Sequence, residues 1–457
     1  MTGQDFTRDR RVATVRATDV AAGLQRLGDV LEWSEVGRGP FGSAIPRGAR
    51  VIVKPNWVLH ENRGPWGLDP LVTDPELIKR IVEGVLAAGP SRVLVGDAPL
   101  QGCHLERLLS ATGLDRWAAE LTSREPSFEG LRDFRRTTCE IRYGVRVARE
   151  DQQPEDDFVM FDLGADSLLE PVTDGRGRFR VTQYDPRKMQ TTHAPGRHCY
   201  LVARAIIEAD VVVNVPKLKT HCKAGITGAL KNLVGINGNK EYLPHHRLGG
   251  SHRGGDCYPG GSVLKRAIEL AMDQSNLAPA PGTRAFAWNA TGDVLGRLAQ
   301  WMGDEVGVEG AWSGNDTVWR MCLDLNRILS YGRADGTLAE TPQRRVLHVV
   351  DAMVAGQGNG PLFAEPLELG LLLGGSNPAA MDWVGAHLLG YDPRRVALAR
   401  EAFGAFRWPI ARFERDEVRL IGDLAGTETL GSLLASGHTV KHPPGWRDSA
   451  ASVLERR

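Results

Sequence analysis

The chain has 457 residues, of which 42% are apolar and 25% are charged, as is usual for a globular protein with a large buried core. Lys+Arg and Asp+Glu both number 56, so the overall charge gives no signal for a nucleic acid or a membrane surface. The six cysteines form no CxxC pair, and there is no signal-peptide-like or membrane-spanning apolar run. We therefore expect a cytoplasmic protein with free thiols and with neither nucleic acid nor membrane as a partner.

Short apolar runs that end in polar residues recur along the chain and predict strands. Because these runs are continuous rather than alternating, the strands are expected to be buried on both faces. Four of these runs are followed closely by polar residues: residues 51–53 by Lys54 and Asn56, 93–95 by Asp97, 211–213 by Asn214 and Lys217, and 346–350 by Asp351.

Helices are predicted between these strands. Asp74 precedes Pro75 and Glu76, a typical helix start, and apolar residues then repeat with helical spacing. A second start is predicted at Asn377, on a helix that carries Asp382. The alternation favours an α/β fold with a mostly parallel sheet and flanking helices, built as two lobes or as one core with two insertions.

The alternation fails in two stretches. Residues 121–198 are rich in charged and turn residues, which predicts an insertion or cap with short strands. Residues 251–338 carry four tryptophans and helical spacing, which predicts a mainly helical insertion. The α/β core then comprises residues 1–120, 199–250 and 339–440, and residues 441–457 form a surface tail.

Positive charge is concentrated after the strand at 211–213. Between Val211 and Lys240 there are five lysines and no acidic residue. A solvated helix surface would mix Glu with Lys, so a bound carboxylate, phosphate or sulfate explains the excess better. The hydroxyl, amide and backbone donors of this segment suit the same ligand.

The polar groups at the strand ends are expected to share one crevice, because ligands bind beyond the carboxyl ends of parallel strands. The alternative for each of them is a turn cap without further role. The expected catalytic residues are Lys54, Asp97, Lys217, His221 and Asp351. The expected substrate-binding residues are Asn56, Asn214, Lys219, Thr220, Lys231, Asn232, Asn359 and Asp382. Asn359 lies in a glycine-rich stretch, 356–361, that is expected to be a loop, either plain or open to a ligand.

Six of the twelve histidines lie between residues 193 and 252. His221, close to Lys219, is expected to have a lowered pKa, which suits a general base. The others could be ordinary hydrogen-bonded histidines or ligands of a divalent metal, although no HExxH-like spacing supports a metal. The metal candidates are His193, His198, His245, His246 and His252.

Several motifs, in this order, resemble those of the domain of unknown function 362 family: VIVKPNW, VLVGDAP, ADVVVNVPKLKTH with GALKNLVGING, and VVDAMVAGQGNGP with AAMDWVGAHLLGYDP. The resemblance spans about Val12 to Pro393. It points to Lys54, Asn56, Asp97, Lys217, Lys219, His221, Lys231, Asn232, Asp351 and Asp382.

The resemblance also bears on cofactors. Many members of that family carry a ferredoxin-like cysteine cluster, which this chain lacks, so we expect no iron–sulfur cluster and no other evident cofactor. A remoter resemblance, in domain plan only, is to two-lobed α/β enzymes of the lactate racemase type, without any nickel-cofactor signature.

These observations support three hypotheses. The first is an enzyme that transfers a proton on a small anionic metabolite, as an isomerase, lyase or condensing enzyme does. The second is a metal-dependent hydrolase or lyase that uses the histidine-rich segment. The third is a non-catalytic accessory protein that binds an anion. A homodimer is compatible with all three.

Overall fold

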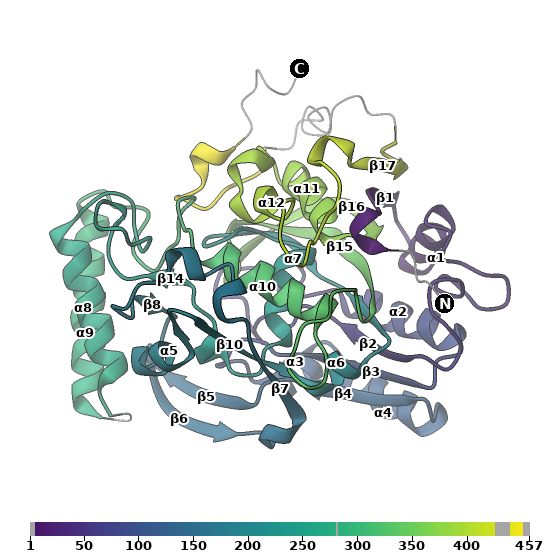
Figure 1. The fold of residues 1–457 in the computed structure, drawn as a ribbon, viewed down its shortest axis with the longest axis horizontal. Helices are drawn as coiled ribbons and strands as arrows, with labels where there is room; N and C mark the ends of the chain where they lie inside the picture. Colours follow the sequence, from purple (N-terminus) through teal and green to yellow (C-terminus); the bar gives the residue numbers. More distant parts are fainter. Residues whose placement is uncertain (1–4, 280–281, 426–438, 451–457) are drawn as a thin grey trace.

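The computed structural model describes residues 5–279, 282–425 and 439–450. Its centre is a mostly parallel sheet in the order β17-β1-β16-β15-β11-β2-β3-β4, with the β12–β13 hairpin added alongside β15. The predicted α/β fold is therefore confirmed (Figure 1). The strands of this sheet are β1 (Arg11–Arg16), β2 (Arg50–Lys54), β3 (Arg92–Asp97), β4 (Phe128–Asp133), β11 (Val211–Asn214), β12 (Lys217–His221), β13 (Gly225–Thr227), β15 (Arg345–Asn359), β16 (Phe363–Gly375) and β17 (Arg419–Gly422).

Helices cover both faces of the sheet, which explains the continuous apolar runs. Val211 and Val213 pack in the same cluster as α1, α2 and α4, whereas Val212 between them packs on the opposite face with α6 and α10. The helices are α1 (Val20–Val30), α2 (Pro75–Ala87), α3 (Leu105–Ala111), α4 (Leu114–Arg124), α5 (Pro186–Thr192), α6 (Arg204–Glu208), α7 (Ala229–Asn232), α8 (Val263–Leu277), α9 (Thr283–Trp301), α10 (Val318–Tyr331), α11 (Pro378–Leu388) and α12 (Ala397–Glu401). Among the helices of the described ranges, none combines the length and apolarity needed to cross a bilayer.

The two predicted helix starts are confirmed by their caps. The side chain of Asp74 accepts a hydrogen bond from the backbone N–H of Glu76 at the start of α2. The side chain of Asn377 accepts from the N–H groups of Ala379 and Ala380 at the start of α11. These bonds satisfy backbone donors that a helix leaves free in its first turn.

Smaller sheets lie beside the central one. They are β5 (Thr137–Arg142) with β6 (Val145–Asp151), β7 (Phe158–Asp162) with β10 (Arg197–Ala203) and β9 (His193–Ala194), and β8 (Phe179–Arg180) with β14 (His246–Arg247). Within the range predicted for the first insertion, β4 instead pairs with β3 in the central sheet. Within the second range, α10 is buried along its length except at Arg320.

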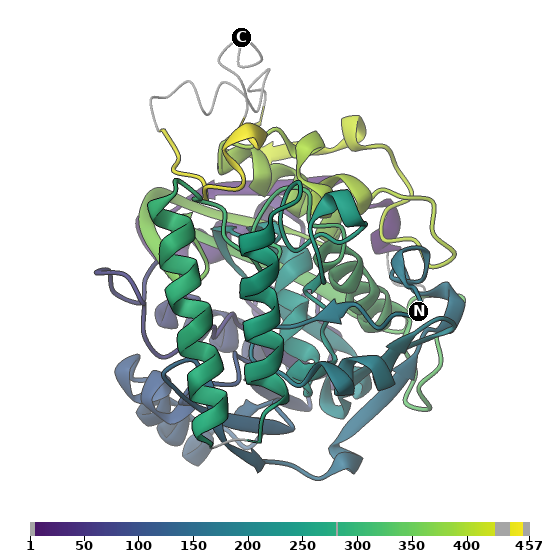
Figure 2. The same cartoon turned by 90° about the vertical axis from the view of Figure 1, so that its left-hand side faces the viewer.

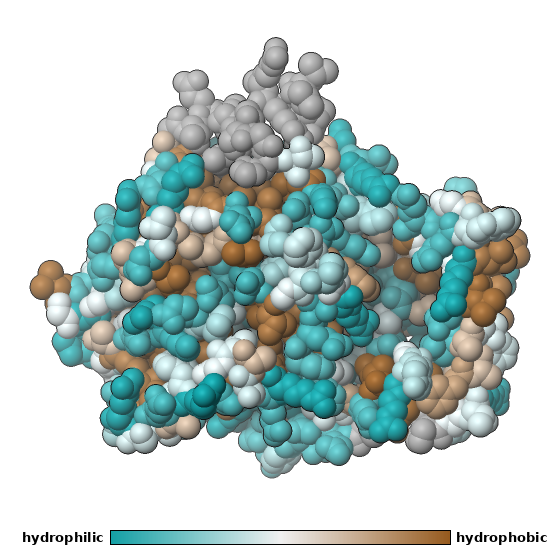
Figure 3. Space-filling model, turned by 180° about the vertical axis from the view of Figure 1, so that it is seen from behind, coloured by the Kyte–Doolittle hydropathy of each residue, from teal (hydrophilic) through white to brown (hydrophobic). Residues whose placement is uncertain are grey.

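Helices α8 and α9 form a hairpin at the edge of the molecule, apart from the central sheet (Figures 1 and 2). Seen from behind, apolar side chains gather at the edge where this hairpin lies (Figure 3). The exposed apolar residues of the hairpin and of Met302, which follows it, are Val263, Leu270, Val294, Leu298, Trp301 and Met302.

Two sequence-based expectations were wrong. The strand predicted to end at Asp351 continues as β15 to Asn359, so the glycine-rich stretch lies mostly in the β15–β16 hairpin. The hairpin pairing gives these glycines backbone partners that a loop would lack. The described part of the predicted surface tail, residues 441–450, contains Trp446, which is 2% exposed and whose indole Nε1 donates to the carbonyl of Cys222; residues 451–457 lie outside the described ranges.

Asp382, predicted to bind substrate or to interact with a helix dipole, caps the neighbouring helix α7. Its two carboxylate oxygens accept from the N–H groups of Ala229 (2.5 Å) and Leu230 (3.1 Å). Asp382 is 1% exposed, and its burial raises its pKa to about 7. Both oxygens are occupied by the backbone of α7, so Asp382 positions this helix instead of facing a ligand.

We expect Asp382→Ala to destabilise the protein by about 1–3 kcal/mol, because the substitution leaves two buried N–H donors without an acceptor. The check is the midpoint of urea unfolding, with Asp69→Ala, at an exposed position, as control. An unchanged midpoint in Asp382→Ala would contradict the capping role.

Candidate functional site

Two buried lysine–aspartate pairs lie at the carboxyl side of the sheet. Lys54 Nζ is 2.7 Å from Asp97 Oδ1, across the ends of β2 and β3. Lys217 Nζ is 2.6 Å from Asp351 Oδ2, at directly paired positions of β12 and β15. All four side chains are at most 3% exposed. The structure thus brings four of the five expected catalytic residues into two ion pairs.

Each aspartate is held by the backbone as well. Asp97 Oδ2 accepts from the N–H of Trp57 and Asp351 Oδ2 from the N–H of Asp74, both at 2.8 Å. Gly235 crosses directly over the first pair, where a Cβ atom would lie 1.9 Å from Asp97 Oδ1. Only glycine allows the chain to approach the pair so closely.

Three other lysines of the basic segment are buried without an acidic partner in the described ranges. Lys219 Nζ donates to Asn56 Oδ1 at 2.6 Å and to the carbonyl of Leu71, and Lys240 Nζ donates to the carbonyl of Val234 at 3.0 Å. Lys231 is 9% exposed, and no described group bonds its amine. Of the five lysines in the basic segment, Lys217 pairs with Asp351 and Lys223 lies 3.6 Å from Glu309. The positive charge that has no nearby carboxylate partner therefore belongs to Lys219, Lys231 and Lys240.

Burial lowers the pKa of each of these three amines. For Lys240 the pKa falls to about 7. For Lys219 it falls well below its usual value, because burial and the charges of Lys217 and Lys231 outweigh the opposing carboxylates Asp97 and Asp351. Lys219 also lies close to the first ion pair, because it bonds Asn56 and the next residue, Trp57, donates its backbone N–H to Asp97. A bound anion would reverse these shifts.

His221 presents a hydrogen-bond donor to its surroundings. Its Nδ1 accepts from the backbone N–H groups of Lys223 (3.1 Å) and Ala224 (3.3 Å). A nitrogen that accepts from N–H groups carries no proton, so the neutral ring is protonated at Nε2. Burial, followed by the charge of Lys231, lowers its pKa well below the usual value.

His245 has the opposite tautomer. Its Nδ1 lies 2.7 Å from the carbonyl oxygen of Leu243, which can only accept, so Nδ1 carries the proton. Its Nε2 is left with a lone pair and no hydrogen-bond partner within the described residues. Burial and the charges of Lys223 and Lys231 lower its pKa well below the usual value. Of the two rings, His245 is therefore the one with a lone pair available to take a proton.

The expected substrate-binding residues divide into two groups. Lys219, Lys231 and Asn56 lie at the site, and Asn232 has a buried Oδ1 without a described partner. Asn214 and Thr220 instead bond the backbone of neighbouring elements: Asn214 Nδ2 donates to the carbonyl of Ala229, and Thr220 Oγ1 donates to the carbonyl of Gly358. Asn359 is exposed, at the end of the β15–β16 hairpin.

The metal candidates do not converge. His193 and His198 bond each other through Nδ1 at 3.2 Å, and His193 also bonds the carbonyl of Tyr242. His246 has a buried Nδ1 without a described partner, and His252 is exposed. Within the described ranges, no three His, Cys, Asp or Glu side chains are grouped to hold a metal ion.

The sequence analysis assigned no role to Lys240 and grouped His245 with metal candidates. The lysine excess was the only signal for Lys240, because its burial beside the first ion pair depends on the fold. The tautomer of His245 depends on a carbonyl two residues away whose direction the sequence does not specify.

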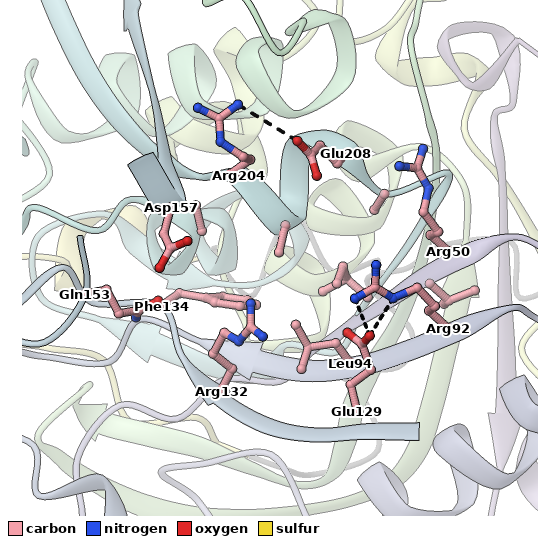
Figure 4. Close-up of a pocket in the computed structure, with 15 residues that line it drawn as sticks. Arg50, Arg92, Leu94, Glu129, Arg132, Phe134, Gln153, Asp157, Arg204 and Glu208 are labelled. Carbon is pink, nitrogen blue, oxygen red and sulfur yellow. Dashed lines mark hydrogen bonds and ion pairs between the residues drawn. The ribbon is translucent and has the colours of Figure 1, made fainter. Parts of the chain in front are cut away.

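A separate cavity, with an empty volume of about 770 Å³, lies toward the amino ends of β2 and β3. Its lining arginines are largely compensated, since Arg92 pairs with Glu129 and Arg204 with Glu208 (Figure 4). None of the expected site residues lines it.

Comparisons with known proteins give a family and distant relatives. The family described as "Domain of unknown function (DUF362)" matches residues 51–150 and 165–387, more than half of the chain. A thylakoid-associated protein of Synechocystis sp. is 22% identical over 358 residues, which cover 78% of this chain and 68% of that protein.

Two solved structures are similar at low levels. A protein from Thermotoga maritima has a TM-score of 0.33 at 11% identity, over 79% of this chain and 55% of that one. The lactate racemase apoprotein from Thermoanaerobacterium thermosaccharolyticum has a TM-score of 0.32 at 12% identity, over 85% of this chain and 59% of that one. The chain thus spans less than two thirds of either structure, and likeness at this level carries no argument about function.

We expect both histidines to be neutral at pH 6 and to differ in tautomer, with the proton of His221 on Nε2 and that of His245 on Nδ1. Long-range ¹H–¹⁵N correlation spectra of histidine-labelled protein test this, with signals assigned through His221→Gln and His245→Gln. An imidazolium pattern for either ring at pH 6 would contradict the lowered pKa.

Proposed function

We propose that this chain, which belongs to the DUF362 family, is an enzyme that binds a small carboxylate- or phosphate-bearing metabolite and transfers a proton on it. Isomerisation, elimination and condensation are reaction types that begin with this step: the proton returns to another carbon, a leaving group departs, or the carbanion attacks a second substrate. The observation that carries the proposal is the amine of Lys231, which no described group bonds, together with two histidines of opposite tautomer whose pKa values burial and its charge lower.

The lysines supply the binding energy for an anion. A buried amine without a counter-ion is costly, and its pKa falls until it loses its charge or gains a partner. Lys231 and Lys240 would regain full charge beside a carboxylate or phosphate, and Lys219 would contribute from beside the ion pairs. The donor at His221 Nε2 suits an oxygen of the same ligand.

Proton transfer falls to His245 in this proposal. Its Nε2 lone pair takes a proton from the carbon next to the bound carboxylate or carbonyl group, and the charge that develops on oxygen is stabilised by Lys231 and the His221 N–H. A bound anion also raises the pKa of His245 by offsetting Lys223 and Lys231, which makes the ring a stronger base once substrate is present. The proton then returns to another carbon, or to a leaving group.

The two ion pairs position the rest of the site. Lys54 and Lys217 are each held by an aspartate and by a backbone carbonyl, of Pro55 and Val354 respectively. These contacts hold the four charged groups in place and fix the positions of Lys54 at the end of β2 and of Lys217 at the start of β12. None of the six cysteines forms a disulfide, and we infer a reducing compartment such as the cytoplasm.

We expect Lys231→Met to weaken sulfate binding by at least about tenfold without lowering the thermal midpoint, because the substitution removes a buried, uncompensated charge. Isothermal titration calorimetry and thermal unfolding check the two parts. Lys79→Met, on α2, is the matched control. Sulfate affinity that is unchanged in Lys231→Met would contradict the anion site.

Anion binding is expected to take up protons. Sulfate raises the lysine pKa values in the complex, so the complex holds more protons than the free protein above the free-state pKa, about 7 for Lys240. The affinity for sulfate should therefore be highest below pH 7. Above pH 7 it should fall by up to about tenfold per pH unit for each proton that is taken up. Calorimetry at pH 8 in buffers of different ionisation enthalpy measures the uptake, which should shrink in Lys240→Met. Proton release would refute the proposed charge state.

A further inference from the structure

A large cleft lies between the α8–α9 hairpin and the turn that joins β5 to β6. Its empty volume is about 1470 Å³, open solvent included. Gly292, Gly296 and Ala299 of α9 leave room along one wall, and Tyr143 stands at the β5–β6 turn. Such a cleft is large enough for a ligand well beyond the size of a simple carboxylate.

The cleft meets the lysine site, by which we mean Lys219, Lys231 and Lys240 with His221 and His245, through two residues. Thr182 Oγ1 accepts from Lys223 Nζ at 3.0 Å, Glu309 lies 3.6 Å from the same amine, and both line the cleft. A smaller cavity shares Thr182 and Glu309 with the cleft and extends to His246, the neighbour of His245 in the chain. The backbone N–H of Lys223 donates to His221 Nδ1 at 3.1 Å, so Lys223 links the cleft to the site.

Left-handed backbone is concentrated around this cleft. Across the described residues, the non-glycine residues with positive φ are Glu32, Tyr143 (48°), Gln183 (69°) and Glu309 (72°), and the last three all line the cleft. The turn between β5 and β6 accounts for Tyr143, but Gln183 and Glu309 lie outside hairpins. Such strain persists where a binding surface fixes the backbone.

The chemistry of the lining indicates the ligand class. The side chains of Asn276 and Gln300 line the cleft, and no described group bonds their amides. Tyr143 offers an 89% exposed aromatic ring. Amides and an aromatic face are the groups that bind a sugar ring through its hydroxyls and its apolar face.

We propose that this cleft binds the sugar or polyol body of the substrate, whose phosphate or carboxylate end displaces Glu309 from Lys223 and reaches the lysine site. This inference rests on the proposed function and narrows its substrate to a sugar phosphate or sugar acid. It also gives Glu309 a role as the group that holds Lys223 until the anionic end arrives.

The test compares probes that share an anion: inorganic phosphate with glucose 6-phosphate, and acetate with gluconate. Gly296→Trp fills the cleft, because no atom lies within 4 Å of a Cβ built at Gly296. Ala290→Trp, on an exposed position of the same helix that does not line the cleft, is the matched control. Binding is measured by calorimetry at one pH.

We expect at least one sugar-bearing probe to bind the wild type about tenfold or more tightly than its simple anion. Gly296→Trp should remove this advantage and leave the simple anion within about twofold, whereas Ala290→Trp should change neither. Tyr143→Ala should weaken only the sugar-bearing probe. Equal binding within both probe pairs, or an advantage that survives Gly296→Trp, would overturn the sugar assignment.

The same data separate the two proposals. If simple anions bind and depend on Lys231 but sugars add nothing, the anion site stands and the cleft inference fails. If the sugar-bearing probe loses affinity in Gly296→Trp but not in Lys231→Met, the cleft stands and the lysine site fails. If no probe binds the wild type, both proposals fail.

Discussion

The pairing of Lys217 with Asp351 and of Lys54 with Asp97 is the constraint on which the site depends. Four charged groups lie in the interior at the ends of buried strands, where an unpaired charge would cost several kcal/mol. Each pair joins neighbouring strands and each aspartate also accepts a backbone N–H, so the pairs fix how β2 meets β3 and how β12 meets β15. Removal of one partner from such a pair typically costs about 3–5 kcal/mol.

Lys217 and Lys223 of the basic segment have acidic partners, whereas Lys219, Lys231 and Lys240 have none among the described residues. Lys219 and Lys240 use an amide or carbonyl oxygens, and the amine of Lys231 has no partner among the described residues. Burial, followed by the charges of nearby lysines, lowers the pKa values of His221 and His245 and favours their neutral forms. An anion is the one addition that satisfies the lysines and strengthens His245 as a base at the same time, which is why binding and proton transfer are coupled in the proposed function.

In the proposed function, the region outside the central sheet supplies the access to this site and its selectivity. The segment that contains α8 and α9 does not contribute a strand to the sheet, yet it forms one wall of the cleft that ends at Lys223. Gln183 and Glu309, whose backbones are strained, border this cleft from separate parts of the chain. The central sheet thus holds the charges, and the peripheral elements border the cleft through which we propose that the substrate reaches them.

The fold class and the place of the candidate site could be predicted from the sequence. Continuous apolar runs showed strands buried on both faces, and the polar residues that follow them identified Lys54, Asp97, Lys217 and Asp351. The sequence could not show that these four neutralise one another, because that depends on strand order and register between residues as far apart as Lys217 and Asp351. Nor could it distinguish Lys231, which lacks a partner, from Lys217, or His245 from His221, since burial and the direction of single N–H and C=O groups decide these roles. Such short-range electrostatic differences arise only when the chain has packed, because they depend on distances of a few ångströms between groups that are far apart in the sequence.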